Sequence, residues 1–491
     1  MVDFVLRNVR IVELGRGPGW AGPVDLVVEQ GAVQSIGHGI ERPLGVEEYD
    51  GEGRWLIPGL WDHHVHLAQW TASRQRLDLS GSESPEHVVA RVREHLAEHP
   101  GPLVGYGHRI GTWTTSPTVA MLDEVAPDLP VVLISGDAHH AWMNSRALGR
   151  LGLPAREGLV VENEWYDAHT RIDQVVEPDL SPAAYRRTLD DAAALGVTGV
   201  VDLERGQDPV DWGHRDSPIR VRVATWADGL DAIIDAGLRT GDPLPVASEL
   251  LTMGPLKIIS DGSLNTRTAW CCEEYADGSG AGAPNQTTAE LAGLLERAHA
   301  HGLEVATHAI GDRALDDALT AYDVTGAGGS IEHAQLVRRE SLATMARLGL
   351  RASVQPAHLL DDRDVTEELW PDRADRCFAF RWMLDAGVGV VLGSDAPVSP
   401  LDPWLAIAAA VHRSADDRPP WHPEQALTPR EALAASVDGK GSVHAGMPAD
   451  LVLLDADPLG AYDDTAAAAA ALREMPVALT VVAGNPIHSA I

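Results

Sequence analysis

Residues 288–308 have the sequence TAELAGLLERAHAHGLEVATH, in which a helical pattern over residues 288–301 precedes a short apolar strand that ends at His308. Strands and helices of this kind alternate along the middle of the chain. Further apolar runs occupy residues 130–134, 197–202, 256–259, 329–333, 350–354 and 388–395, and a second helical pattern covers residues 340–349. Repeated strand-then-helix units imply a parallel sheet. The chain length and the polar residues that end so many strands favour a closed (β/α)₈ TIM barrel over an open sheet.

Both ends of the chain are rich in short strands. Residues 4–12 (FVLRNVRIV), 24–30 and 32–36 alternate or are β-branched, and residues 450–455 and 478–486 have the same character. Because chain termini often lie close together, we predict one small β-sandwich domain from residues 1–57 and 441–491. The barrel is expected over residues 58–440. An insertion is expected at about residues 70–180, where charged helices, glycine-rich turns and one strand interrupt the alternation.

The composition narrows the class of protein. The chain of 491 residues can bury a large core, and acidic residues outnumber basic ones by 72 to 38, giving a net charge of −34. This charge repels phosphate backbones and anionic lipid, so we expect no nucleic-acid or membrane partner and a small-molecule substrate instead. The three cysteines imply no disulfide framework, and the N-terminal residues lack the pattern of a secretory signal. We therefore predict a cytoplasmic protein.

An apolar strand ends in a His-x-His pair. Residues 56–66 have the sequence LIPGLWDHHVH. Residues two apart in a strand face the same side, so His64 and His66 can share one metal ion, while His63 is expected to point the other way. Alone, such a pair is more often a pair of ordinary surface or core histidines.

Other strand ends make a metal site the better interpretation. His308 and His333 end successive strands, Asp395 ends a later strand, and Lys257 lies inside the apolar run 255–259. The carboxyl ends of barrel strands meet on one face, where such side chains converge. Imidazoles suit zinc, iron and similar metals, and a bound metal turns water into a nucleophile near neutral pH. Asp395 is the candidate general acid and base.

Lys257 has two interpretations. The chain contains only two lysines, Lys257 and Lys440, and uses arginine for almost every other cation. A lysine desolvated among apolar neighbours can become a neutral amine, which can capture carbon dioxide as a carbamate that bridges two cations, whereas arginine cannot. The alternative is a salt bridge from Lys257 to Asp261 or to another acid at a strand end. The scarcity of lysine favours the carbamate.

Taken together, these motifs resemble the amidohydrolase superfamily, and more narrowly the family 3 branch that includes N-substituted formamide deformylases. The matching segments are PGLWDHHVH (58–66), DAH (137–139) with NS (144–145), KIISDGSL (257–264), HAIGDRA (308–314), IEHAQ (331–335), SVQPAH (353–358), GSDAPV (393–398) and GMPADLVLLD (446–455). They cover nearly the whole chain. One departure is Ala138, where this branch usually has glycine.

The resemblance implies a barrel with a split β-sandwich and one or two divalent metal ions, usually zinc. The implied ligands are His64, His66, His308, His333 and Asp395, with a carboxylated Lys257 as the bridge. His139 and His358 are implied as pocket residues that polarise or orient the substrate, and a purely structural role is the alternative for both. The oligomeric state stays open, and a homodimer is expected only because related enzymes are often dimers.

The predicted reaction is hydrolysis of a carbon–nitrogen bond other than a peptide bond, in an amide, an N-formyl group or a cyclic amide. In this mechanism metal-activated hydroxide attacks the carbonyl carbon, and Asp395 relays the proton to the leaving nitrogen. Two alternatives differ in class: a metal-dependent isomerase or decarboxylase on the same scaffold, and a non-catalytic protein that has kept the barrel.

Overall fold

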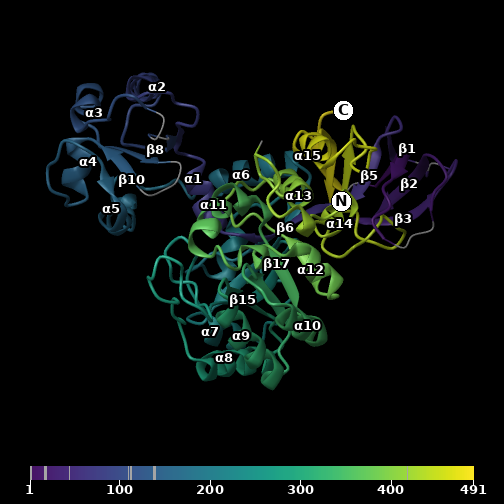
Figure 1. The fold of residues 1–491 in the computed structure, drawn as a ribbon. Helices are drawn as coiled ribbons and strands as arrows, with labels where there is room; N and C mark the ends of the chain where they lie inside the picture. The colour runs from purple at the N-terminus through teal and green to yellow at the C-terminus, as the bar shows by residue number, and fades with distance from the viewer. Residues whose placement is uncertain are drawn as a thin grey trace. The chain divides into compact units, whose positions relative to one another are not determined.

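The computed structural model describes residues 3–15, 19–41, 43, 45–108, 110, 113–135, 140–416 and 418–491. Contacts divide the chain into two compact units, one made of residues 1–70 and 181–491 and the other of residues 71–180. The first unit contains an eight-stranded parallel sheet and a separate sheet built from both termini (Figure 1). The predicted α/β class, the barrel and the terminal β domain are therefore confirmed. The exact domain boundaries, 1–57, 58–440 and 441–491, remain our proposal.

The barrel strands are all hydrogen-bonded in parallel. Their order is β18-β17-β16-β15-β14-β13-β12-β6, which is chain order apart from the seam between the first and last strands. The bounds are β6 (Leu60–Val65), β12 (Val197–Asp202), β13 (Arg220–Trp226), β14 (Leu251–Ile259), β15 (Val305–Ala309), β16 (Gly329–His333), β17 (Arg351–Val354) and β18 (Gly389–Leu392).

The seam between β6 and β18 is closed just beyond the end of β18. The backbone N–H of Asp395 donates to the carbonyl of His64 at 2.7 Å, and the N–H of His66 donates to the carbonyl of Ala396 at 3.0 Å. The sheet thus becomes a nearly closed barrel at the level of the predicted metal ligands.

Helices cover the outer face of the barrel. They are α6 (Pro182–Ala194), α7 (Leu230–Asp235), α8 (Thr288–Ala300), α9 (Asp312–Thr325), α10 (Arg339–Leu348), α11 (Leu359–Leu369), α12 (Phe380–Asp385), α13 (Pro403–His412) and α14 (Pro429–Ala434), and several flank β15 and β17 in Figure 1. Local chemistry sets their ends: Thr287 and Glu290 form a capping box at the start of α8, and Gly326 ends α9 in the left-handed conformation. Their apolar faces pack against the outward side chains of the strands in one large core.

The terminal sheet joins the two ends of the chain. Its order is β21-β20-β19-β5-β1-β2-β3, with β4 beside β1. The bounds are β1 (Phe4–Ile11), β2 (Val24–Glu29), β3 (Ala32–Gly37), β4 (Glu47–Asp50), β5 (Trp55–Pro58), β19 (Leu451–Leu454), β20 (Val477–Val482) and β21 (Asn485–Ser489), and α15 (Thr465–Arg473) follows β19. These strands surround a hydrophobic core of their own. Gly59 carries the chain from β5 into β6, where a Cβ atom would lie 2.0 Å from Oγ1 of Thr198.

The second unit, residues 71–180, contains more strands than its sequence indicates. A five-stranded sheet has the order β11-β10-β9-β8-β7, with bounds β7 (Leu77–Asp78), β8 (Leu103–His108), β9 (Val131–Ser135), β10 (His140–Met143) and β11 (Val160–Val161). It is accompanied by α2 (Pro85–Glu98), α3 (Val119–Val125), α4 (Ser145–Arg150) and α5 (Glu162–His169), and α1 (Leu67–Ser73) leads into the unit. The expectation of one strand was wrong because four of these strands are short or interrupted by glycine and histidine. The apolar run 130–134 belongs to this sheet and not to the barrel.

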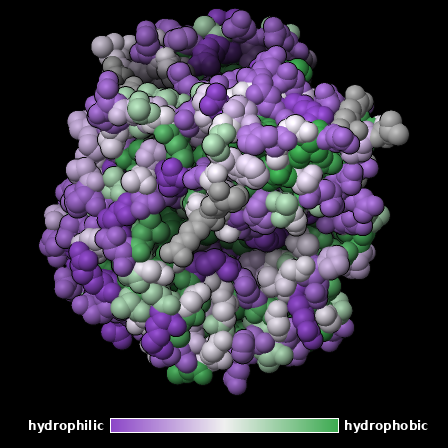
Figure 2. All heavy atoms as spheres, turned by 90° about the vertical axis from the view of Figure 1, so that its right-hand side faces the viewer, coloured by the Kyte–Doolittle hydropathy of each residue, from purple (hydrophilic) through white to green (hydrophobic). Residues whose placement is uncertain are grey.

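The surface is largely polar on one face of the molecule. On the face drawn in Figure 2, hydrophilic residues predominate and apolar residues are scattered in small groups. No helix among the described residues is long and apolar enough to cross a lipid bilayer.

Candidate metal centre

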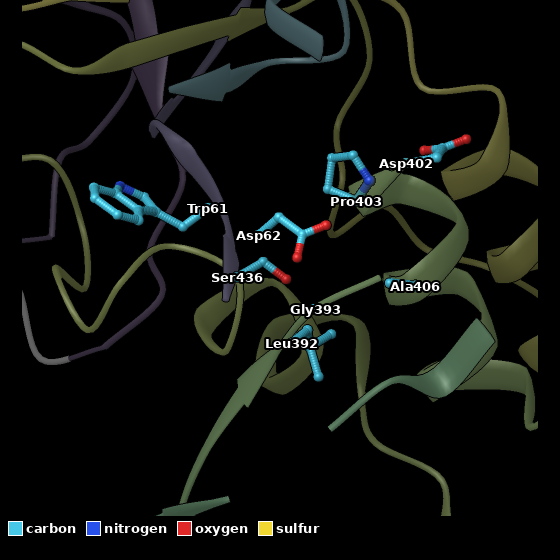
Figure 3. Close-up of a pocket in the computed structure, with 8 residues that line it drawn as sticks. All are labelled: Trp61, Asp62, Leu392, Gly393, Asp402, Pro403, Ala406 and Ser436. Atoms are coloured by element: carbon cyan, nitrogen blue, oxygen red, sulfur yellow. The ribbon is translucent and has the colours of Figure 1, made fainter. Parts of the chain in front are cut away.

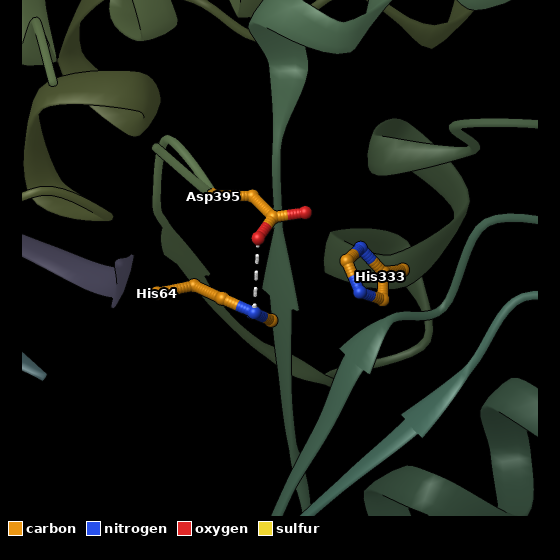
Figure 4. Close-up of side chains that lie close together, drawn as sticks. All are labelled: His64, His333 and Asp395. Carbon is orange, nitrogen blue, oxygen red and sulfur yellow. Dashed lines mark ion pairs between the residues drawn. The ribbon is translucent and has the colours of Figure 1, made fainter. Parts of the chain in front are cut away.

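Three buried side chains from distant strands meet at the carboxyl end of the barrel. His64 lies near the end of β6, His333 ends β16 and Asp395 lies just beyond β18. Their ligand atoms all lie within 4.8 Å of one another (Figure 4). Nε2 of His64 is 3.4 Å from Oδ1 of Asp395, and the rings of His64 and His333 are 5.0 Å apart between centroids. Residues separated by up to 331 positions, from His64 to Asp395, thus form one cluster.

His66 joins the same cluster. Its Nε2 lies 3.3 Å from Oδ1 of Asp395, so His64 and His66 both reach one carboxylate oxygen. The pairing of β6 with β12 shifts register between Asp62 and Val65, which places one extra residue in β6 at this point. His63 lies apart from the cluster, with its Nε2 3.8 Å from Oδ1 of Asp438.

Left-handed backbone conformations set the directions of the side chains of His333 and Asp395. His333 has φ 68° and the next residue, Ala334, has φ 42°, while Asp395 has φ 56°. Such conformations cost roughly 1–3 kcal/mol for residues other than glycine and persist only where surrounding contacts hold them. They interrupt strand alternation, so that Glu332 and His333, although adjacent, both approach His64.

His308 lies beside His333, with ring centroids 4.6 Å apart. Its Nε2 is 3.1 Å from the carbonyl oxygen of Gly262 and 3.4 Å from Oδ1 of Asp261. A carbonyl oxygen can only accept a hydrogen bond, so Nε2 carries the proton and Nδ1 keeps the lone pair for a ligand role. Asp261 is itself fixed by the backbone N–H groups of Trp270 and Gly311, both at 2.9 Å.

Lys257 points into the same cluster from β14. Its side chain is almost completely buried, and Nζ lies 3.5 Å from Nε2 of His64. Among the described residues, no carboxylate lies within 4.0 Å of Nζ, so the alternative of a salt bridge to Asp261 does not hold. Burial lowers the pKa of Lys257, although the charges of Glu332 and Asp395 partly oppose this shift.

His139 and His358 were predicted to be pocket residues. His358, in the short 3₁₀ turn η4 (Pro356–His358), has Nε2 3.8 Å from Oδ2 of Asp395 and its ring 6.2 Å from that of His333. It therefore borders the cluster. His139 lies outside the described residues.

Burial controls the charge of the cluster. It lowers the pKa of His64 to about 4, and burial together with the charge of His308 lowers the pKa of His333 well below its ordinary value. Burial alone would also lower the pKa of His66, but the hydrogen bond and charge of Asp395 outweigh it and raise that pKa. Burial likewise opposes ionisation of Asp395, yet the imidazoles hold its pKa well below the usual range. Near neutral pH the cluster therefore offers the neutral imidazoles of His64 and His333 and the carboxylate of Asp395, while that carboxylate favours the protonated form of His66.

This donor set fits a divalent cation. Nδ1 of His66, Nδ1 of His333 and Nε2 of His358 are buried and have no hydrogen-bond partner within the part of the chain that the structure describes. Burying polar atoms without partners is costly, and neutral imidazoles with a carboxylate are ligands that zinc and similar metals prefer.

Three supporting residues had no role in the sequence prediction. Oε2 of Glu332 lies 2.7 Å from Nδ1 of His64, and Gln355 donates through its amide to the carbonyl of Ser353 at 3.1 Å beside the same ring. Asp62 accepts hydrogen bonds from the backbone N–H groups of His64 and Ser394, both at 3.0 Å, and thereby ties the two seam strands together. Burial raises the pKa of Asp62 to about 6. The available signal for Glu332 was an acid inside a strand, directly before a predicted ligand, as in SIEH (330–333).

Two cavities of the barrel unit contain none of the predicted ligands. A space of about 10 Å³ lies behind β6, lined by Trp61, Asp62, Leu392, Gly393, Asp402, Pro403, Ala406 and Ser436 (Figure 3). It can hold about one water molecule and no substrate. A groove of about 540 Å³ between α9 and α10 contains none of the candidate ligands.

Comparison with known proteins shows which family the chain belongs to. The model of the amidohydrolase family matches residues 47–488. The chain belongs to this family. Protein LONG AFTER FAR-RED 3 of Arabidopsis thaliana is 30% identical over 479 residues, covering 84% of this chain and 79% of that protein. N-substituted formamide deformylase of Arthrobacter pascens is 27% identical over 503 residues, covering 89% of each chain. A metal-dependent hydrolase from Pyrococcus horikoshii has a solved structure that superimposes with a TM-score of 0.77 at 28% identity, over 94% of this chain and 98% of that one.

The family match confirms the resemblance seen in the motifs, and the chain contains a buried group of His64, His333 and Asp395 that could hold a metal ion.

Proposed function

We propose that this amidohydrolase cleaves a carbon–nitrogen bond other than a peptide bond, in an amide, an N-formyl group or a cyclic amide. The observation that carries the proposal is the buried meeting of His64, His333 and Asp395, with ligand atoms within 4.8 Å of one another. We propose His66, His308 and Lys257 as the remaining ligands. The similarity to an N-substituted formamide deformylase over 89% of the chain supports this bond type.

Zinc is the proposed metal, as one or two ions, and when bound it supplies Lewis acidity that polarises a carbonyl and makes water nucleophilic near neutral pH. The chain supplies the proton transfers. Oδ1 of Asp395 faces His64 and His66, at 3.4 and 3.3 Å, while Oδ2 is turned toward His358 at 3.8 Å. We propose that Oδ1 serves the ligand cluster and that Oδ2 takes a proton from water and passes it to the leaving nitrogen.

Lys257 is proposed to be carboxylated on Nζ. The lone pair of the neutral amine forms a bond to the carbon of carbon dioxide, and one proton leaves the nitrogen, so the product is a carbamate anion without any oxidation or reduction. Burial lowers the pKa of Lys257 and thus favours the neutral amine that this step needs. The 3.5 Å distance from Nζ to Nε2 of His64 supports a place for the carbamate oxygens among the ligands.

His358 is proposed to orient the substrate carbonyl. Its Nε2 is buried beside Asp395 and has no hydrogen-bond partner within the described residues, so it can donate to an oxygen that enters the cluster. The same role is proposed for His139. A cytoplasmic location and a homodimeric assembly remain predictions that come from the sequence and from the resemblance.

The proposal is tested by elemental analysis of the purified protein together with a screen of N-formyl and N-acyl amines in water labelled with oxygen-18. We expect a bound divalent metal and one labelled oxygen atom in the carboxylic product. A product without label would favour an isomerase or decarboxylase, and protein free of metal and without turnover would favour a non-catalytic scaffold.

A further inference from the structure

Glu332 is placed to act on the metal centre without belonging to the proposed ligand set. It lies on β16, directly before His333, and its side chain is almost completely buried. Oε2 lies 2.7 Å from Nδ1 of His64, and Oε1 accepts a hydrogen bond from the hydroxyl of Ser330 at 2.5 Å. Each carboxylate oxygen therefore has one defined partner.

These contacts fix the tautomer of His64. A carboxylate can only accept a hydrogen bond, so Nδ1 must carry the hydrogen and Nε2 must keep its lone pair. Nε2 is the atom that faces Oδ1 of Asp395 at 3.4 Å and Nζ of Lys257 at 3.5 Å. With the opposite tautomer, a lone pair at Nδ1 would face the carboxylate of Glu332, and an N–H would face the site of the cation.

A second contact to the same nitrogen does not change this assignment. The amide nitrogen of Gln355 lies 3.4 Å from Nδ1 of His64 and makes its shorter hydrogen bond, of 3.1 Å, to the carbonyl oxygen of Ser353. The carboxylate contact is shorter by 0.7 Å and joins a donor to an acceptor.

We propose that Glu332 is a positioning residue that holds the ring of His64 in its ligating orientation and raises the affinity of the centre for metal. The inference rests on the proposed metal-dependent function. A carboxylate behind a ligating imidazole fixes the ring and increases its basicity, and loss of such a partner typically costs about 10- to 100-fold in metal affinity. Ser330 supports the carboxylate in turn.

The test compares the metal dissociation constants of three proteins in competition with a chromophoric chelator: wild type, Glu332→Gln and Glu431→Gln. Glutamine keeps the size of Glu332 and removes its charge, so we expect zinc binding to weaken by about 10- to 100-fold and the visible spectrum of the cobalt-substituted protein to shift. Glu431 is the matched control, because its carboxylate pairs with Arg381 and Thr428 and contacts none of the proposed ligands. That variant should bind zinc as the wild type does.

A measurement on the wild type tests the tautomer directly. In nitrogen-15 NMR spectra of the histidine rings, with His64 assigned by its loss in His64→Ala, we expect hydrogen on Nδ1 and none on Nε2. Hydrogen on Nε2 overturns the proposal even if Glu332→Gln fails to fold. Equal zinc affinity in wild type and Glu332→Gln also overturns it while leaving the proposed function intact. A wild type that takes up no divalent metal overturns both.

Discussion

The two lysines of this chain lie at opposite ends of the barrel and in opposite surroundings. At the amino end, Lys440 donates to Oδ2 of Asp450 at 3.0 Å, and Arg220 binds the same carboxylate through two hydrogen bonds of 2.8 and 3.0 Å. At the carboxyl end, Lys257 lies among imidazoles, and no carboxylate of the described chain lies within 4.0 Å of its Nζ. The difference agrees with the proposed function, in which charged groups stabilise the amino end of the barrel and carry out chemistry at the carboxyl end.

We expect the largest difference in activity and stability between the two ends of the barrel when one acid is neutralised at each end. We expect Asp395→Asn to reduce kcat/KM by at least about 10²- to 10⁴-fold, as for loss of an acid–base group, with little loss of stability. His64→Ala should do the same. Asp450→Asn should instead keep turnover and lose about 3 kcal/mol of unfolding free energy, because two partly buried cations lose their partner. Steady-state kinetics and denaturant unfolding measure the two effects, and near-normal activity in Asp395→Asn would remove Asp395 from the mechanism.

Exchange of each lysine for arginine sharpens the comparison. Lys257→Arg should be inactive and contain less metal, because a guanidinium cannot form a carbamate. Lys440→Arg should keep activity within about twofold and change stability by less than about 1 kcal/mol, as for a partly exposed ion pair. Activity assays and elemental analysis of both proteins decide this point. Metal content like that of the wild type in Lys257→Arg would contradict the carboxylated lysine.

Removal of metal should act through the ligand cluster at the carboxyl end of the barrel and leave the ion pairs at the amino end unchanged. Dialysis against a chelator is expected to abolish turnover and to lower the melting temperature by several degrees, since a ligand at about 1,000 times its dissociation constant stabilises by about 4 kcal/mol. Added zinc should restore both in the wild type and in Asp450→Asn. Turnover that survives complete chelation would show that the cluster does not work through a metal.

The smallest expected effect is the acid dependence of the amino end. Burial raises the pKa of Asp450, but the hydrogen bond from Arg220 and the charges of Lys440 and Arg220 outweigh it, so the pKa lies below its ordinary value. A depressed folded-state pKa gives stability that is present above the unfolded-state pKa of about 3.9 and is lost as the pH falls through the folded-state pKa. Unfolding midpoints of wild type and Asp450→Asn should therefore converge as the pH is lowered below about 4. A constant difference would mean that the carboxylate charge is not what stabilises this end.

The sequence predicted seven of the eight barrel strands and missed β13, because its local pattern does not resemble that of a buried strand. Apolar runs that end in His or Asp are recognisable because both faces of those strands are buried. Strand β13 has the sequence RVRVATW, in which Arg220 and Arg222 alternate with valine. Arg222 is half-buried and binds the carboxylate of Asp438 through two hydrogen bonds of 2.8 Å, which lets an arginine stand in this strand. A partner 216 residues away cannot be inferred from the local pattern.

The same limit applies to the candidate site. The His-x-His spacing at the end of β6 was enough to predict that His64 and His66 lie together. Positions at strand ends were enough to predict that His308, His333 and Asp395 lie near them. The supporting contacts depend on backbone angles that the sequence does not specify. The left-handed conformation of His333 is what allows Glu332, its neighbour, to reach His64 as well.

The seam of the barrel has a consequence for biosynthesis. The first and last barrel strands meet through the backbone of His64 and Asp395, and the same two residues are proposed metal ligands. A chain emerging from the ribosome holds His64 early but lacks Asp395 until most of its length has been made. The complete cluster therefore exists only after the ring of strands has closed, so the proposed cation can be bound by the finished protein and not by a nascent fragment.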